Sequence, residues 1–231
     1  MTSCTSHQPS EVTEQPTHST NHSDPKNRHS IAQASSPEAL LAQISGRAID
    51  ETELDSGLIF LAASLTLLLG VMAINRSPDP HNQSYLQSVL DAALQNGKLS
   101  PHLVQALAEG IEGHQIYLNP RLFLLMTSTL SESERLLLLG LGYDMAATGT
   151  HFGLQVQMYL RAIAQRLRIP SAYQACLESS FTQQDMTHFD ALPDIADLTH
   201  PTSFQSESNL LQLLAHRIHP SMERLATLAN A

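Results

Sequence analysis

The spacing of apolar residues along the chain is helical, most clearly in two segments. In residues 82–96 and 153–168, apolar side chains recur three and four positions apart, so each segment has one apolar face to bury. These faces consist of Leu86, Val89, Leu90, Ala93 and Leu94 in the first segment, and Val156, Tyr159, Leu160, Ile163 and Leu167 in the second. The sequence contains no convincing run of alternating apolar and polar residues. We therefore predict an all-α protein.

Helix starts are marked by short polar residues that suit the N-cap position. Such a residue stands directly before proline at Ser36-Pro37, Ser100-Pro101 and Asn119-Pro120. Ser131 and Glu134 have the spacing of a capping box in front of the apolar run 136–139. These signals and the apolar spacing predict helices at about 37–48, 54–75, 82–96, 100–113, 120–129, 132–148, 153–168 and 171–182.

The segment 57–74 reads GLIFLAASLTLLLGVMAI and contains no charge. A membrane-spanning helix needs about 20 predominantly apolar residues, so the segment lies at the edge of that range. A second apolar run, 136–147, is interrupted by Tyr143 and Asp144 and cannot span a bilayer. If the two runs are equivalent elements of one fold, the first is a central helix that is apolar all round because neighbours surround it. We expect burial in a bundle, with a membrane span as the alternative.

The two ends of the chain differ from the central region. Residues 1–35 are rich in Ser, Thr, His, Gln, Pro and Asn and nearly lack aliphatic side chains, a composition typical of a disordered arm. Residues 184–231 begin with a weak pattern and end in an apolar repeat that Pro220 is expected to divide into two short helices. We therefore predict a polar arm at 1–35, a helical bundle at 36–183, and a linker with amphipathic helices at 184–231.

The net charge of the chain disfavours partners that are themselves negatively charged. Its 231 residues have a formal net charge of −10, which argues against gripping nucleic acid or an anionic membrane through bulk electrostatics. The densest basic strip, Arg161, Arg166 and Arg168, alternates with apolar residues. That arrangement is typical of the solvated side of an amphipathic helix. We expect no nucleic-acid partner.

The two cysteines and the N-terminal residues indicate in which cellular compartment the protein is located. Cys4 and Cys176 form neither a disulfide framework nor a C-x-x-C metal motif, so a reducing cytoplasm is expected. The N-terminus has no basic stretch followed by an apolar segment, so we expect no secretory signal. Membrane association through 57–74 is the alternative localisation.

Two stretches of the chain contain the same short motifs in the same order. Residues 67–94 and 137–167 both contain an apolar run with glycine, then Met-Ala, a turn, and Tyr-Leu-x-x-[Val/Ile] leading to a final leucine. This weak internal duplication predicts two helix–turn–helix halves with pseudo-twofold symmetry. The second copy, YDMAATGTHFGLQVQMYLRAIAQRLRI at 143–169, resembles the central signature of TerB-like domains of the tellurite-resistance TerB superfamily. The resemblance covers roughly residues 55–182 and implies a TerB-like helical bundle.

In TerB-like domains, the Asp of an Asp-Gly turn and a Glu opening the next helix are proposed to bind divalent cations, as hard oxygen ligands do. The resemblance places Thr148 at the Asp position and Gln155 at the Glu position, so the acidic motif is degenerate. Two weak candidate metal ligands remain: Asp144, about one turn before Thr148, and Asp79 in the corresponding loop of the first copy. The alternative is that Asp144 contacts water or a nearby arginine. No other cofactor is expected.

No set of residues assembles a recognisable catalytic motif. The chain lacks G-x-S-x-G, and Cys176 lies between apolar residues as a small buried side chain would. We expect a non-enzymatic binding or scaffold protein with a protein partner, in the stress-response or membrane-associated setting that the resemblance implies. The alternatives are a single-pass membrane protein anchored by 57–74 with a cytoplasmic helical domain, and a divalent-cation-binding protein.

Overall fold

The fold is all-helical across the part of the chain that the structure, a computed structural model, describes. Described are residues 31, 33–49, 54–75, 79–95, 98–149, 152–182, 189–204 and 209–229, without the side chains of 222 and 224–229. The α-helices among them are α2 (Pro37–Ser45), α3 (Ser56–Asn75), α4 (Pro80–Gln95), α5 (Pro101–Gly113), α6 (Pro120–Met126), α7 (Glu132–Thr148), α8 (Leu154–Arg166), α9 (Ser171–Thr182), α10 (Leu192–Thr199) and α11 (Asn209–Ala229). Three short 3-10 helices lie at Ile116–Leu118, Phe189–Ala191 and Pro201–Phe204. The all-α prediction is confirmed.

The predicted helix starts are confirmed by their hydrogen bonds. The side chains of Ser36, Ser100 and Asn119 accept backbone N–H groups at the first turns of α2, α5 and α6. At α7 the amide of Ser131 donates to Glu134 Oε2 at 2.6 Å, and the amide of Glu134 donates to Ser131 Oγ at 3.2 Å. This reciprocal pair is the predicted capping box. Because these signals act within three residues, they could be read from the sequence.

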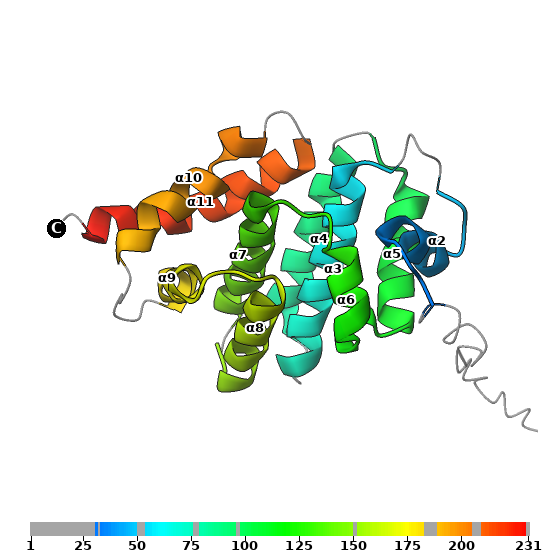
Figure 1. Cartoon of the computed structure of the whole chain (residues 1–231), viewed down its shortest axis with the longest axis horizontal. Coiled ribbons are helices and arrows are strands. Elements are labelled where there is room, and N and C mark those ends of the chain that lie inside the picture. The colour runs from blue at the N-terminus through cyan, green and yellow to red at the C-terminus, as the bar shows by residue number, and fades with distance from the viewer. Residues whose placement is uncertain are drawn as a thin grey trace, which may run out of the picture.

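Helix α3 occupies the middle of the bundle (Figure 1). It contacts α2, α4, α5, α6, α7, α8 and α11, and residues 57–68 are buried without interruption. In the described part of the chain it is the one helix long and apolar enough to cross a membrane, and 78% of its most apolar window is buried inside the protein. Burial on all sides explains why α3 has no polar face.

The two halves of the predicted duplication pack across each other. The amphipathic helix α4, which follows α3, packs on α7, and α8, which follows α7, packs on α3. Gly70 and Gly142 mark the close approaches: a Cβ at Gly70 would stand 2.1 Å from Tyr159 Oη, and one at Gly142 would stand 2.8 Å from Leu160 Cδ2. The glycines therefore allow α8 to lie against both long helices.

The C-terminal region differs from its predicted form. Pro220 was expected to split the last repeat, but α11 runs through it as one helix. Buried Leu214, Ile218 and Ser221 lie on both sides of Pro220, so packing of the two halves offsets the backbone hydrogen bond that proline cannot make. The prediction also missed α10, which starts with Pro193 in its first turn, where proline needs no hydrogen-bond partner. Both helices pack on α7 and α9.

The predicted polar arm ends earlier than expected. Ile31 and Ala34, three residues apart, are 3% and 5% exposed and belong to the hydrophobic core. The burial of this apolar pair corrects the boundary at residue 35. Residues 1–30, which carry the rest of the predicted disordered arm, lie outside the described residues.

Candidate functional site

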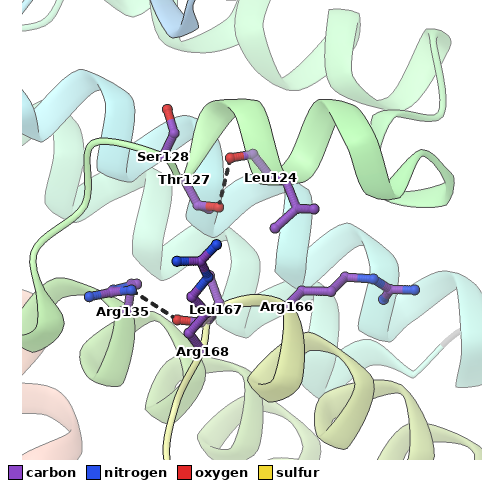
Figure 2. A pocket seen from close by; sticks show the side chains of 7 residues that line it. All are labelled: Leu124, Thr127, Ser128, Arg135, Arg166, Leu167 and Arg168. Atoms are coloured by element: carbon purple, nitrogen blue, oxygen red, sulfur yellow. Dashed lines mark hydrogen bonds between the residues drawn. The ribbon is translucent and has the colours of Figure 1, made fainter.

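A cavity of about 370 Å³ opens where the end of α6 meets the start of α7 and the end of α8 (Figure 2). It is called the arginine pocket below, because three of its seven lining residues are arginines: Leu124, Thr127, Ser128, Arg135, Arg166, Leu167 and Arg168. Figure 2 shows the guanidinium of Arg168 pointing toward the turn that carries Thr127, with Arg135 on one side of it and Arg166 on the other, where the Arg166 side chain extends away from Arg168. The volume lies in the range of small-molecule sites.

Arg168 has a backbone conformation that arginine rarely adopts. Its amide donates to the Gln165 carbonyl at 3.1 Å, and the amide of Ile169 donates to the Ala164 carbonyl at 3.0 Å. These two bonds form a Schellman motif, in which the residue at the position of Arg168 is left-handed and usually glycine. Arg168 has φ of 58°, a conformation that costs a non-glycine residue roughly 1–2 kcal/mol. Strain of this kind often accompanies a functional side chain.

Arg135 connects two of the helix ends that form the pocket. Its Nη1 donates to the carbonyl of Leu167 at 3.1 Å, and its Nε donates to the carbonyl of Ser131 at 3.3 Å. One guanidinium therefore joins the first turn of α7 to the end of α8. It also supplies a donor to one of the carbonyls that α8 leaves unpaired at its C-terminus. The remaining N–H groups of Arg135 are available to a ligand.

No acidic residue is among the described residues that line the pocket, and ion pairs are made instead by Arg161 and Arg217. Three arginines thus line one cavity in a protein whose net charge is −10. Arginine stays protonated at all physiological pH values, so the pocket favours an anion.

A second cavity, of about 230 Å³, is acidic but has its carboxylates committed to helix starts. It is lined in part by Glu38, Asp55 and Glu134. Asp55 Oδ1 accepts the amide of Leu58 at 2.8 Å, and Glu134 closes the capping box of α7. The pKa of Glu38 is lowered chiefly by its hydrogen bond with Ser36. Each carboxylate is placed where it stabilises the first turn of a helix, so this cavity is the weaker candidate.

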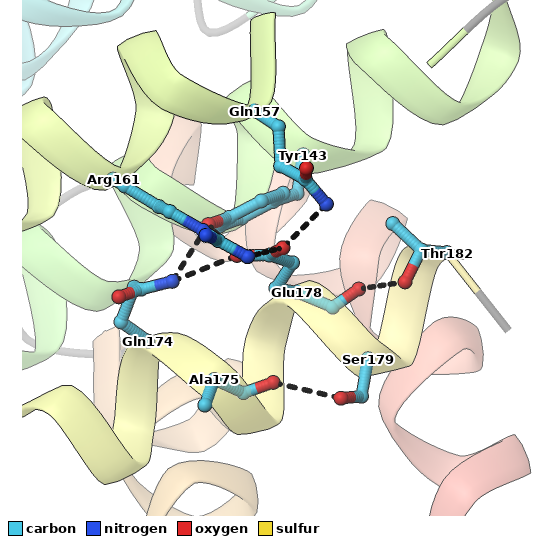
Figure 3. Close-up of polar contacts among 8 residues, drawn as sticks. All are labelled: Tyr143, Gln157, Arg161, Gln174, Ala175, Glu178, Ser179 and Thr182. Carbon is cyan, nitrogen blue, oxygen red and sulfur yellow. Dashed lines mark hydrogen bonds and ion pairs between the residues drawn. The ribbon is translucent and has the colours of Figure 1, made fainter. Parts of the chain in front are cut away.

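A buried carboxylate on α9 forms the largest polar cluster among the described side chains (Figure 3). The side chain of Glu178 is 5% exposed. It accepts hydrogen bonds from Tyr143 Oη at 3.2 Å, Gln157 Nε2 at 2.6 Å, Gln174 Nε2 at 2.8 Å, and Arg161 Nε and Nη2 at 2.9 and 2.7 Å. Burial, together with the charge of Glu178, raises the pKa of Tyr143. Because its partners come from α7, α8 and α9, Glu178 joins these three helices, and the five donated hydrogen bonds saturate its carboxylate.

Asp144 has protein partners in the structure. Tyr85 Oη donates to Asp144 Oδ2 at 2.8 Å, and Arg217 Nε lies 3.5 Å from the same oxygen. The Arg217 guanidinium also stacks 3.8 Å from the centre of the Tyr85 ring and donates to Ser88. Burial, and then the charge of Asp144, raises the pKa of Tyr85. Contact with an arginine was the alternative weighed for Asp144, and Arg217 on α11 supplies it.

Asp79 lies at the start of α4. Its Oδ1 accepts the amide of His81 at 2.9 Å, and a Cβ at Gly149 would stand 3.0 Å from its Oδ2. Asp79, just before α4, therefore lies close to Gly149, just after α7. Among the described residues, no group of three or more His, Cys, Asp or Glu side chains could hold a metal. Metal binding by Asp79 and Asp144 stays a prediction.

The arginine pocket was not predicted from the sequence. Arg166 and Arg168 were grouped with Arg161, yet Arg161 pairs with Glu178, while the other two line the pocket with Arg135 from α7. One local signal was present: arginine occupies the position two residues before Pro170, where the end of a helix favours glycine. No sequence pattern within a few residues indicated that Arg135 lies near Arg168.

The chain was compared with known proteins at three levels. No family model, no curated protein and no solved structure matches it.

Proposed function

We propose that this protein is a non-enzymatic helical binding protein whose arginine pocket binds an anionic group. The observation that carries the proposal is that three arginines, and no carboxylate, are among the described residues that line one cavity. The surrounding bundle supports a binding role, because the buried carboxylate of Glu178 and the partly exposed carboxylate of Asp144 serve as links between helices. A protein partner and the stress-response setting implied by the TerB resemblance are part of the proposal.

Inorganic sulfate tests whether the pocket binds anions. At constant ionic strength, replacing chloride with sulfate should raise the melting temperature of the wild-type protein more than that of Arg168→Gly, because bound ligand stabilises only the folded protein that can bind it. Sulfate also stabilises proteins non-specifically by exclusion from their surface, and the variant measures that contribution. Arg121→Gln, which changes an exposed arginine of α6 outside the pocket, should respond like the wild type. An equal increase in all three proteins would contradict the proposal.

The length and apolar composition of α3 support a second candidate function, a single-pass membrane protein with a cytoplasmic helical domain. The burial of α3 against seven other helices favours the bundle. Fractionation of cells followed by a carbonate wash separates the two. We expect recovery in the soluble fraction, and retention in the washed membrane pellet would instead support the anchor.

A further inference from the structure

We infer that the arginine pocket binds the phosphomonoester group of a small, hydroxyl-bearing molecule. The inference rests on the proposed function, that the pocket binds an anion, and adds the chemical class of that anion and of the molecule that carries it. It follows from three properties of the pocket: its charge, the hydrogen-bonding state of its hydroxyl groups, and its size.

The charge of the pocket favours a divalent anion. A phosphomonoester carries about −1.5 to −2 charges at pH 7 and three strong acceptor oxygens, whereas a carboxylate or a sulfate ester carries one charge. Arg168 lies between Arg135 and Arg166 (Figure 2), so donors reach the cavity from more than one side. A tetrahedral group with three terminal oxygens can use such donors, while the two oxygens of a carboxylate lie in one plane. Arginine forks fit phosphoryl oxygens well.

The hydroxyl groups of the pocket favour a ligand that donates hydrogen bonds. Thr127 Oγ1 donates to the Phe123 carbonyl at 2.9 Å, and Ser128 Oγ donates to the Leu125 carbonyl at 2.7 Å. Each hydroxyl has a single hydrogen, and both hydrogens are used by the end of α6. Thr127 Oγ1 therefore remains as an acceptor on the side of the pocket that Arg168 points toward, whereas Ser128 Oγ points away from Arg168 (Figure 2). An alcohol group on the ligand would satisfy the Thr127 oxygen.

The size of the pocket favours a small molecule. Its volume of about 370 Å³ is at the lower end of the range for small-molecule sites. Leu124 and Leu167 supply apolar lining, against which a short carbon skeleton can pack. A phosphorylated peptide needs further contacts along its backbone, which a cavity bounded by three helix ends does not extend to provide.

A simpler explanation of Arg166 and Arg168 is that they stabilise the C-terminal end of the α8 dipole. That explanation does not involve Arg135, which comes from α7 and covers the Leu167 carbonyl. It also predicts that replacing Arg168 would destabilise the protein. A left-handed residue in a Schellman motif favours glycine, so our inference predicts that Arg168→Gly melts at the same temperature as the wild type or higher while its binding of a phosphomonoester weakens.

Isothermal titration of the full chain with three matched ligands tests the inference. Glycerol 3-phosphate should bind most tightly. Ethyl phosphate, which has no alcohol group, should bind about 2-fold to 10-fold more weakly, as expected for a neutral hydrogen bond. Ethyl sulfate, which has the shape of ethyl phosphate and one charge fewer, should bind at least about 10-fold more weakly than ethyl phosphate, as expected for loss of a charge-assisted contact.

The pH dependence identifies the charge state of the ligand. The charged lining residues are Arg135 on α7 and Arg166 and Arg168 at the end of α8, and arginine stays protonated at all physiological pH values. The other lining residues, Leu124, Thr127, Ser128 and Leu167, have side chains without charge. Changes in affinity therefore report protonation of the ligand, whose second pKa is about 6. Affinity for ethyl phosphate should fall as pH is lowered from 7.5 to about 5, and affinity for ethyl sulfate should stay constant.

Variants connect binding to the pocket. Arg168→Gly should weaken glycerol 3-phosphate binding about 10-fold to 100-fold, and Arg121→Gln should leave it unchanged.

Equal affinity for ethyl phosphate and ethyl sulfate, or no pH dependence, would overturn the inference while leaving the proposed function intact. A phosphoserine peptide that binds more than about 10-fold tighter than glycerol 3-phosphate would overturn the small-molecule assignment. Absence of heat with every anion, together with no specific effect of sulfate, would overturn the proposed function itself.

Discussion

Replacing Glu178 with alanine is expected to lower the free energy of unfolding by about 3 kcal/mol and the melting temperature by about 6–12 °C. The substitution removes the one carboxylate that accepts hydrogen bonds from three helices. Tyr143, whose side chain is completely buried, would lose its acceptor, and an unpaired buried hydroxyl costs about 1–3 kcal/mol. Arg161 is 51% exposed, so its guanidinium regains water and the loss stays at the low end of the range for a broken buried ion pair.

Urea and thermal unfolding, followed by helical circular dichroism, measure this loss. Glu178→Gln is the matched control, because it keeps the volume and one acceptor oxygen. It should cost about half as much as Glu178→Ala, since the neutral amide accepts weaker hydrogen bonds from Arg161. If Glu178→Ala unfolds within about 1 kcal/mol of the wild type, the cluster does not stabilise the contact of α9 with α7 and α8.

Replacing Gly110 with alanine is expected to destabilise the protein by about 3 kcal/mol by forcing α2 away from α5. A Cβ at Gly110 would stand 2.1 Å from the carbonyl oxygen of Ile44 and 2.9 Å from its carbonyl carbon. The obstructing atoms belong to the backbone of α2, so no side-chain rotation relieves the clash. Ile44 is 4% exposed, and displacing it also exposes part of the core.

Gly113, three residues further along α5, provides a control with the opposite sign. A Cβ at Gly113 would meet nothing within 4 Å, and alanine favours a helix over glycine by up to about 1 kcal/mol. Gly113→Ala should therefore leave stability unchanged or raise it. The urea midpoints of the two variants give the comparison. Equal stability of Gly110→Ala and the wild type would show that α2 can move away from α5 without cost.

The helices of the bundle could be predicted because their signals are local. Caps such as Ser100 and the box of Ser131 and Glu134 act within one turn, and an apolar repeat is visible over three turns. Prediction failed where proline was taken as a helix breaker. Pro193 occupies a first turn that tolerates proline, and Pro220 is held inside α11 by buried neighbours on both sides. Packing against other helices therefore decided the case of Pro220, whereas the place of Pro193 in a first turn is a local property.

The candidate site could not be predicted in the same way. Arg135 and Leu167 are joined by a hydrogen bond but are 32 positions apart in the chain, and the helices between them determine their contact. The same holds for Asp144, which meets Tyr85 59 positions away and Arg217 on α11. The strip of Arg161, Arg166 and Arg168 looked uniform, yet its members point to different neighbours.

The sequence by itself determined an all-α chain, its helix starts and an uncharged central segment, because capping and apolar periodicity depend on residues within a few positions of each other. Only the tertiary structure decided what surrounds those helices. An apolar helix such as α3 is compatible with lipid or with protein neighbours, and its enclosure depends on helices that are distant in the chain. The arginine pocket likewise exists because three helix ends meet, and packing rather than local sequence brings them together.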